Sequence, residues 1–223
     1  AIDPDLNLAV VTNNKDNTAS LIDLNSEAVV ATINVGKGPR GVGINPSTHM
    51  AAIANFIDGT ITVIDLLSRQ AVQTLSAGTS PEAVDINPNT NQAVVTLDSL
   101  NLLTILQLDN PIPMISGLVP ISISAGNPAF TLTIQGSRFI TTSVVNFNGQ
   151  AMATQFVSAT KLTASIPALA ITAAGTVPVT VTNPAPAGGT SDPYQFTIKY
   201  PLPVLTALSP NSISARSADF TLR

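Results

Sequence analysis

The sequence has no cysteine, no tryptophan and a single histidine, and charged residues make up only 10% of its 223 positions. Without cysteine there can be no disulfide framework, no thiol catalysis and no thiolate metal site. No run of about 18 apolar residues occurs, so the sequence predicts no membrane-spanning helix. Aromatic residues are 4% of the chain, which disfavours a site that holds sugars by stacking them on aromatic rings.

The few charges are divided unevenly along the chain. Residues 1–110 hold four Lys and Arg against eleven Asp and Glu, whereas residues 111–223 hold five against two. Neither half contains the cluster of Lys and Arg that binding to a phosphate backbone requires. We therefore expect no nucleic-acid partner.

The abundant residues are small or β-branched, and they are interrupted by 17 prolines and 13 glycines. This composition is typical of many short strands joined by turns. The first half of the chain also repeats every 42 residues, and a fixed period of this length indicates one supersecondary unit stacked on the next. Three tripeptides mark the period: Ile2-Asp3-Pro4, Ile44-Asn45-Pro46 and Ile86-Asn87-Pro88.

The pattern within each 42-residue unit predicts four short strands. In the second unit we predict strands at about residues 50–55, 60–66 and 71–75, and residues 82–86 form the entry to the next unit. Residues 60–66 alternate polar and apolar side chains, as a half-buried strand does. Four antiparallel strands in about 40–45 residues are the blade of a β-propeller. About two and a half units are present, so we predict consecutive blades that do not close into a ring alone.

Two segments of this unit are characteristic in sequence. Val11-Thr12-Asn13 is followed by a Thr-Ala-Ser-Leu-Ile-Asp run at residues 18–23, and residues 36–42 form a Gly-Lys-Gly-Pro-Arg-Gly-Val connector. These segments resemble the YVTN family of propeller repeats, with Val10 or Ala52 where the family usually has an aromatic residue. The resemblance implies a cell-surface or S-layer-associated protein of bacteria or archaea. Lactonase-type propellers share the blade but are enzymes.

Beyond residue 110 the period changes to 90 residues. Pro111, Pro113, Leu118, Pro120 and Phe130 recur as Pro201, Pro203, Leu208, Pro210 and Phe220. About seven short alternating strands between residues 111 and 200 predict a β-sandwich. Its predicted core consists of Phe130, Leu132, Ile134, Phe139, Phe147, Ile166, Val179, Val181 and Phe196.

Two runs in this second repeat carry a further resemblance. They are Phe-Thr-Leu-Thr-Ile-Gln-Gly at residues 130–136 and Val-Pro-Val-Thr-Val-Thr-Asn at residues 177–183. Both are similar to the IPT/TIG immunoglobulin-like domain, which implies extracellular or cell-surface stalks in bacteria. The same fold serves in DNA-binding regulators, but those carry basic loops that are absent here. We therefore predict a partial propeller at residues 1–110, an IPT/TIG sandwich at 111–200 and the opening strands of a second one at 201–223.

His49 is the only imidazole in the chain. It lies in a polar segment between predicted strands, and its equivalents in the neighbouring units are Asn7 and Asn91. No Ser-His-Asp or Cys-His arrangement can be built around it. We predict an exposed turn residue rather than a ligand.

The acidic residues recur at the repeat period. Asp23 is equivalent to Asp65, and Asp16 is equivalent to Asp58. Acid/base catalysis needs carboxylates that converge in one pocket, whereas copies on successive blades serve each blade locally. We predict that these side chains satisfy the backbone amides of turns.

Three other segments have the outline of a binding site. Asp3-Pro4-Asp5-Leu6-Asn7 opens like a calcium loop, but the glycine and the distant glutamate of such a loop are missing, so we expect no metal dependence. The Gly-Lys-Gly sequence at residues 36–38 lacks phosphate-loop spacing and predicts an inter-blade turn. Residues 184–191 predict a flexible loop at one end of the sandwich, without aromatic or charged side chains.

Together these patterns predict an all-β chain: a partial β-propeller, then an Ig-like β-sandwich and the start of a second. We expect a fragment of a longer secreted or surface-attached protein of a bacterium or archaeon, with a non-catalytic role in display, adhesion or envelope structure. No catalytic, cofactor-binding or metal-binding residue is predicted, and the expected partners are proteins, surface glycans or further copies of the chain. Two alternatives stay open: an accessory binding region of an extracellular carbohydrate-active enzyme, and a lactonase-type propeller enzyme.

Overall fold

The computed structural model describes residues 1–201, 207, 209 and 212, and its described part is built almost wholly from strands. Residues 1–107 form three antiparallel sheets of four, four and three strands, each ordered as in the sequence. The first sheet contains β1 (Ile2–Asp3), β2 (Leu8–Asn13), β3 (Thr18–Asp23) and β4 (Ala28–Asn34). The second contains β5 (Pro39–Asn45), β6 (Met50–Asn55), β7 (Thr60–Asp65) and β8 (Gln70–Ser76). The third contains β9 (Pro81–Asn87), β10 (Gln92–Leu97) and β11 (Leu102–Gln107), with a short 3-10 turn at Asp98–Leu100.

The predicted blades are therefore present, with one correction to their bounds. The predicted connector at residues 36–42 is too long, because Pro39 already begins β5, which pairs with β6. Only residues 36–38 remain as the inter-blade turn, where Gly38 has a φ of 66°. The hairpins inside each sheet turn at left-handed residues, including Asn17, Gly59 and Asn101 at equivalent positions of the three units. Asparagine and glycine tolerate this conformation better than other residues.

The three sheets stack face to face around two apolar cores. The core between the first and second sheets includes Leu21, Ile53 and Ile64, and the core between the second and third includes Ile61 and Val95. The second sheet lies between both cores, so every residue of β6 is buried. Because both faces of β6 are covered, its side chains are apolar at every position except the last. A strand that is covered on one face only alternates apolar and polar side chains.

Residues 114–199 form a sandwich of two sheets. One sheet has the order β12 (Met114–Val119), β14 (Phe130–Ser137), β18 (Lys161–Ile166), β17 (Ala153–Ser158). The other has the order β13 (Ser122–Ser124), β21 (Tyr194–Lys199), β19 (Gly175–Asn183), β15 (Val144–Phe147), β16 (Gln150–Ala151), and β20 (Gly189–Thr190) also pairs with β19. A second 3-10 turn covers Ala168–Ile171. Seven of these strands have four residues or more, as the sequence predicts.

The predicted sandwich core is confirmed at all positions but one. Eight of the nine predicted side chains have no exposed surface, and Phe130 is half-buried at the edge of the core. The Phe196 ring packs edge-on against Phe147 at 5.4 Å between centroids, an arrangement that aromatic rings prefer. The predicted opening strands of a second sandwich, at residues 201–223, lie largely outside the described residues.

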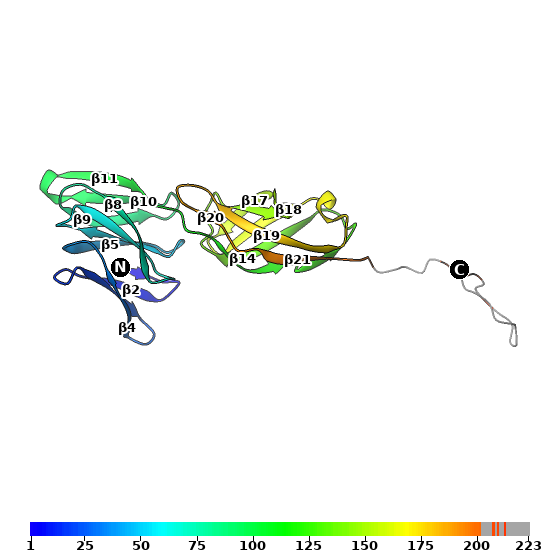
Figure 1. The fold of residues 1–223 in the computed structure, drawn as a ribbon, viewed down its shortest axis with the longest axis horizontal. Coiled ribbons are helices and arrows are strands. Elements are labelled where there is room, and N and C mark those ends of the chain that lie inside the picture. The colour runs from blue at the N-terminus through cyan, green and yellow to red at the C-terminus, as the bar shows by residue number, and fades with distance from the viewer. Residues whose placement is uncertain (202–206, 208, 210–211, 213–223) are drawn as a thin grey trace.

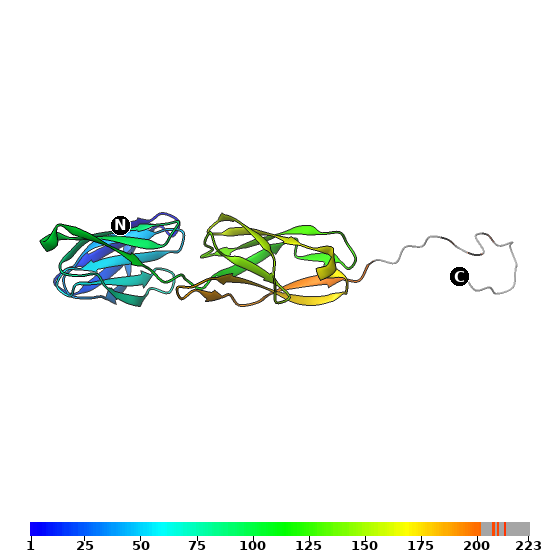
Figure 2. The same ribbon diagram turned by 90° about the horizontal axis from the view of Figure 1, so that it is seen from above.

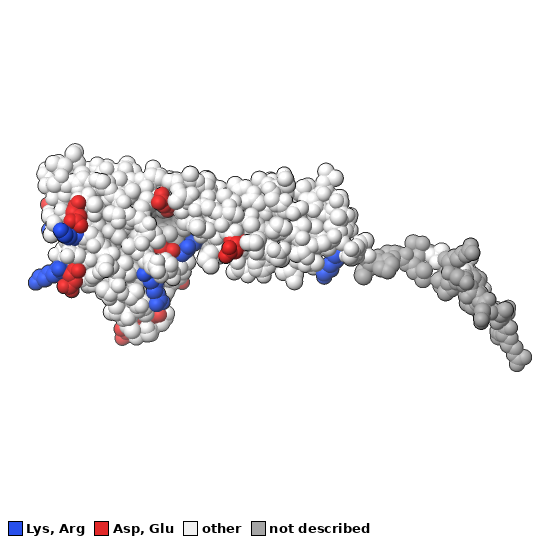
Figure 3. Space-filling model, viewed as in Figure 1, with Lys and Arg blue, Asp and Glu red and all other residues white. Residues whose placement is uncertain are grey.

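The two units follow one another along the long axis of the molecule. In Figure 1 and in the view turned by 90° in Figure 2, the sandwich extends from the strand ends of the stacked sheets and leaves the outer sheet faces uncovered. The visible charges are few, and most of them lie on the stacked sheets rather than on the sandwich, as Figure 3 shows. Among the described residues, no helix has the length and apolar character needed to cross a membrane.

Candidate functional site at the junction of the two β units

Buried polar pairs link consecutive sheets along one rim of the stack. Asp3 Oδ2 lies 2.9 Å from His49 Nδ1, and Asn45 Nδ2 donates to Asn91 Oδ1 at 3.1 Å. Both pairs join residues 46 positions apart, which is one repeat plus four residues. We call this series the rim ladder, and its rungs connect the first sheet to the second and the second to the third.

The rim ladder corrects the prediction for His49. Its φ of 57° confirms a turn residue, but only 6% of its surface is exposed, so the prediction of an exposed side chain is wrong. The carboxylate of Asp3, itself fully buried, covers and binds the imidazole. The ring nitrogen is thus committed to a structural contact between sheets.

The same acidic positions organise their own turns. Asp3 Oδ1 accepts the backbone N–H groups of Asp5 and Leu6, both at 3.1 Å. The apparent calcium loop is therefore a turn whose first carboxylate is used by the protein itself. Among the described residues, no group of three or more His, Asp or Glu side chains is placed to hold a metal ion.

Asp23 and Asp65 repeat this turn, which confirms their predicted local role. Asp23 Oδ1 accepts the N–H groups of Asn25 and Ser26 at 2.8 and 3.1 Å. These bonds, that from Ser26 above all, lower the pKa of the Asp23 carboxyl below its ordinary value. Asp58, which was also predicted to bind turn amides, accepts the Lys37 N–H at 2.7 Å through Oδ2 and so stabilises the inter-blade turn.

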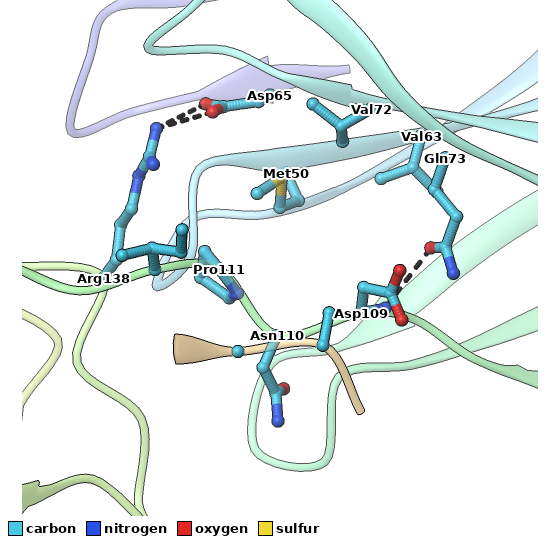
Figure 4. Close-up of a pocket in the computed structure, with 12 residues that line it drawn as sticks. Met50, Val63, Asp65, Val72, Gln73, Asp109, Asn110, Pro111 and Arg138 are labelled. Carbon is cyan, nitrogen blue, oxygen red and sulfur yellow. Dashed lines mark hydrogen bonds and ion pairs between the residues drawn. The ribbon is translucent and has the colours of Figure 1, made fainter. Parts of the chain in front are cut away.

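Asp65 has a second role that the sequence did not reveal. Arg138, the residue directly after β14 in the sandwich, places Nη2 at 2.6 and 2.7 Å from the two oxygens of Asp65. The side chains are only 12% and 8% exposed, so the pair is largely desolvated. Figure 4 shows Arg138 reaching across to Asp65. This ion pair joins the stacked sheets to the sandwich.

Asparagine side chains complete the junction. Asn91, the last residue of the rim ladder, donates to the backbone oxygen of Asp109 at 3.0 Å. Asn110 donates from its side chain to the Pro184 oxygen at 2.9 Å. Asn183 Nδ2 donates at 2.8 Å to the backbone oxygens of Pro111 and Arg138.

These contacts also correct the prediction for residues 184–191. The Asn110 N–H donates to the Pro186 oxygen, and the Gly188 N–H donates to the Asn110 oxygen, each at 2.9 Å. Gly189 and Thr190 form β20, which pairs with β19. The segment is therefore anchored against the junction instead of projecting as a free loop.

A cleft of about 280 Å³ lies beside the Arg138–Asp65 pair. Met50, Val63 and Val72 form an apolar wall, and Asp109 lies on the opposite side (Figure 4). Arg138 Nε is buried and has no hydrogen-bond partner among the described residues. Two carboxylates, those of Asp65 and Asp109, are among the groups that line this cleft.

The residues singled out from the sequence thus divide between two places. His49, Asp3 and Asp65 make contacts between one sheet or unit and the next. Asp23, in contrast, bonds only within a turn of the first sheet. Arg138 was missed. Its only sequence signal is that it is an isolated cation in a nearly uncharged segment.

Comparison with known proteins supports the assignment of the sandwich. Residues 113–198 match the family model of the IPT/TIG domain. No curated protein matches the chain at a significant level. The predicted relation of residues 1–110 to YVTN repeats stays a prediction, as do the predicted domain boundaries.

Three solved structures are similar to parts of this chain. Kuenenia stuttgartiensis hydrazine synthase is 13% identical with a TM-score of 0.46, over 83% of this chain and 55% of that one. The TIG domain of human nuclear factor of activated T-cells, cytoplasmic 4, is 19% identical with a TM-score of 0.30, over 40% and 89%. Apo AztD from Citrobacter koseri is 14% identical with a TM-score of 0.30, over 41% and 29%. This chain thus spans about half of the hydrazine synthase chain, and TM-scores this low give no information on activity. Residues 113–198 are an IPT/TIG domain, joined by a buried ion pair to a stack of propeller-like sheets.

Proposed function

We propose that the chain is a non-catalytic scaffold of a secreted or cell-surface protein, which holds a binding or assembly surface at a fixed distance and orientation. The observation that carries this proposal is the set of polar contacts between the IPT/TIG domain and the stacked sheets. The Arg138–Asp65 pair and the bonds of Asn110 and Asn183 form that junction, and we expect them to keep it rigid. A spacer needs such a junction, because a flexible linker would not keep the two units aligned.

The side chains that usually perform catalysis support the same proposal. The chain has no cysteine, its His49 is buried against Asp3, and the carboxylates of Asp23 and Asp65 are occupied by turn amides. A propeller enzyme needs a nucleophile, a metal or a general base near its axis. The proposal extends to an extracellular or surface location in a bacterium or archaeon, with protein or glycan partners.

The test combines a turnover assay with a binding assay on the 223-residue chain. Lactones and aryl glycosides should not be hydrolysed above the rate of a buffer blank. The labelled chain should sediment with purified cell-wall sacculi or S-layer sheets, with serum albumin as the non-binding control. Turnover that disappears in a His49→Ala or Asp65→Asn variant would contradict the non-catalytic assignment, and no sedimentation with any envelope preparation would contradict the surface role.

The accessory binding region of a carbohydrate-active enzyme is the second candidate. Only the cleft beside Arg138 favours it, because that cleft has an apolar wall with polar groups on its edge. Oligosaccharides added to the chain should then shift NMR signals of Met50 and Val72, whereas a scaffold that binds through its outer faces should leave these signals unchanged.

A further inference from the structure

The turn between the first and second sheets satisfies two successive backbone donors with side-chain oxygens. Gly38 N–H donates to Asn17 Oδ1 at 2.9 Å. Lys37 N–H donates to Asp58 Oδ2 at 2.7 Å. The two oxygens come from the central hairpins of the sheets that the turn connects. The first turn therefore shows which groups this backbone conformation binds, namely an amide oxygen and a carboxylate oxygen.

The turn between the second and third sheets keeps this conformation but has lost the amide oxygen. Ser80 is the equivalent of Gly38, and its φ of 56° is close to the 66° of Gly38. Gly59 takes the place of Asn17, so this position has no side chain to accept from the Ser80 N–H. Among the described residues this N–H has no hydrogen-bond partner. Serine rarely adopts a left-handed conformation, yet here it keeps one, with its backbone donor unused.

A hollow of about 420 Å³ lies at this second turn. Residues 56–59 of the β6–β7 hairpin form one wall, and Ser76 and residues 78–80 form the other. Gly59 is part of the wall, so the space that the Asn17 side chain fills at the first turn is open at the second. The carboxylate oxygen has no counterpart here either, because Leu100 is the equivalent of Asp58.

The groups around the hollow combine donors, acceptors and apolar surface. Ser76, Thr79 and Ser80 supply hydroxyl groups, and Asp58 supplies a carboxylate. Ile57, which is 71% exposed, supplies apolar surface. The charge of Asp58 disfavours an anionic ligand, whereas the hydroxyl groups of a sugar both donate to a carboxylate and accept from N–H and O–H groups. The lining is therefore suited to a neutral, hydroxyl-rich ligand.

We propose that this hollow binds an N-acetylated amino sugar, whose acetamido oxygen accepts the Ser80 N–H as Asn17 Oδ1 accepts the Gly38 N–H. An acetamido group contains the same kinds of heavy atoms as an asparagine side chain, so the protein itself supplies the template for this contact. The sugar hydroxyls then bind Asp58 and the hydroxyl groups of the second turn. The inference deepens the proposed surface role, on which it rests, by naming the chemistry of a glycan partner and the place where it binds.

Hydrogen bonds, rather than stacking, hold the sugar in this arrangement. Phe56 also lines the hollow, but the guanidinium carbon of Arg40 lies over its ring at 3.5 Å from the centroid. The hollow also lies far from the sandwich along the strands. β7 runs from Thr60, next to the hollow, to Asp65, which pairs with Arg138 of the sandwich. The site is thus at the end of the stack where a scaffold can present a ligand-binding surface.

The test is an NMR titration of the 223-residue chain with N-acetylglucosamine, glucose and acetamide. N-acetylglucosamine should shift the Ser80 amide signal in a saturable way, acetamide should shift it more weakly, and glucose should leave it in place. Gly59→Asn supplies an amide from the chain itself and should lose these shifts. Gly126→Asn is the matched control, because Gly126 also has a positive φ, of 79°, and no atom lies near its Cβ position; it should respond like the parent chain.

Three results would overturn the proposal. Glucose and N-acetylglucosamine could shift the Ser80 signal equally, which would exclude recognition of the acetamido group. An acetylated asparagine amide could bind more tightly than the sugar, which would assign the hollow to a protein side chain. The sugar could shift Met50 and Val72 instead, which would place it in the cleft beside Arg138. Sedimentation with envelope preparations can succeed in each case, so the proposed function and this inference fail separately.

A second variant keeps the test decisive if circular dichroism shows that Gly59→Asn is unfolded. Asn17→Gly removes the amide oxygen from the first turn and frees the Gly38 N–H. Acetamide should then shift the Gly38 amide signal, which it should leave unchanged in the parent chain. No shift in this variant would contradict the use of the Asn17 contact as the template.

Discussion

The ion pair between Asp65 and Arg138 offers the sharpest quantitative test of the junction. Replacing Asp65 by Asn removes the charge but leaves an oxygen that still accepts the N–H groups of Leu67 and Ser68 at 3.0 and 3.4 Å. Exposed ion pairs contribute about 0.2–1 kcal/mol, whereas removing one partner of a buried pair costs about 3–5 kcal/mol, because the other charge stays buried and unpaired. With 8% and 12% of the two side chains exposed, we expect Asp65→Asn to cost about 3 kcal/mol.

The repeat supplies a matched control for this experiment. Asp23 forms the same turn with Asn25 and Ser26 but is only half-buried in the first sheet. Asp23→Asn keeps the acceptor of the turn and should cost less than about 1 kcal/mol, since asparagine and aspartate serve nearly equally at such positions. The difference between the two substitutions isolates the contribution of Arg138.

The assay is denaturant unfolding followed by circular dichroism, because the chain has no tryptophan to report by fluorescence. A double-mutant cycle with Asp65→Asn and Arg138→Gln gives the coupling energy directly. We also expect each single variant to separate the unfolding of the sandwich from that of the stacked sheets. A coupling energy below about 0.5 kcal/mol would refute the reasoning, because the pair would then be worth no more than a surface contact.

Three further predictions concern the sandwich core, the contact between the second and third sheets, and the titration of Asp23. Phe196→Ala should destabilise the sandwich by about 3–5 kcal/mol, since the ring is fully buried; a loss below about 1 kcal/mol in denaturant unfolding would contradict its place in the core. Gly43→Ala should cost about 1–3 kcal/mol, because its Cβ would meet backbone atoms of the third sheet at 2.7 Å, whereas Gly117→Ala, whose nearest contact is a flexible glutamine side chain, should cost measurably less by the same assay. The Asp23 carboxyl should titrate below 3.8 in an NMR experiment, and its stabilising contribution, present at neutral pH, should be lost as the pH falls through that lowered pKa; a titration above 3.8 would mean that the turn bonds are absent in solution.

The sequence predicts well the positions and buried faces of strands, because these depend on the local alternation of polar and apolar side chains. The strand expected at residues 60–66 is β7 at Thr60–Asp65, and the alternating positions of β14 and β19 point into the sandwich core as expected. Side chains two positions apart share a face of a strand, so a short segment contains all the information needed. The turn role of Asp23 was predicted from the repeat instead, because Asp65 occupies the equivalent position one unit later.

Contacts between sheets, or between the stack and the sandwich, could not be predicted from patterns within a short segment. His49 was compared with Asn7 and Asn91 as a turn position, but its partner Asp3 is 46 residues away and reaches it only when two sheets stack. Asp65 and Arg138 are 73 residues apart, in units of different architecture. Their meeting depends on how the sandwich docks on the stack, and no pattern within either unit specifies that docking.

The burial of the second sheet on both faces has a consequence for how the stack comes apart. Opening either outer sheet exposes one face of the second sheet, so the free energy of each opening is set by one interface. Opening the second sheet would break both interfaces at once. In hydrogen exchange we therefore expect the amides of β6 and β7 to be the slowest of the stack, and those of β1 and β11 the fastest. The middle sheet is therefore the last part of the stack to open, although the array is assembled from separable repeats.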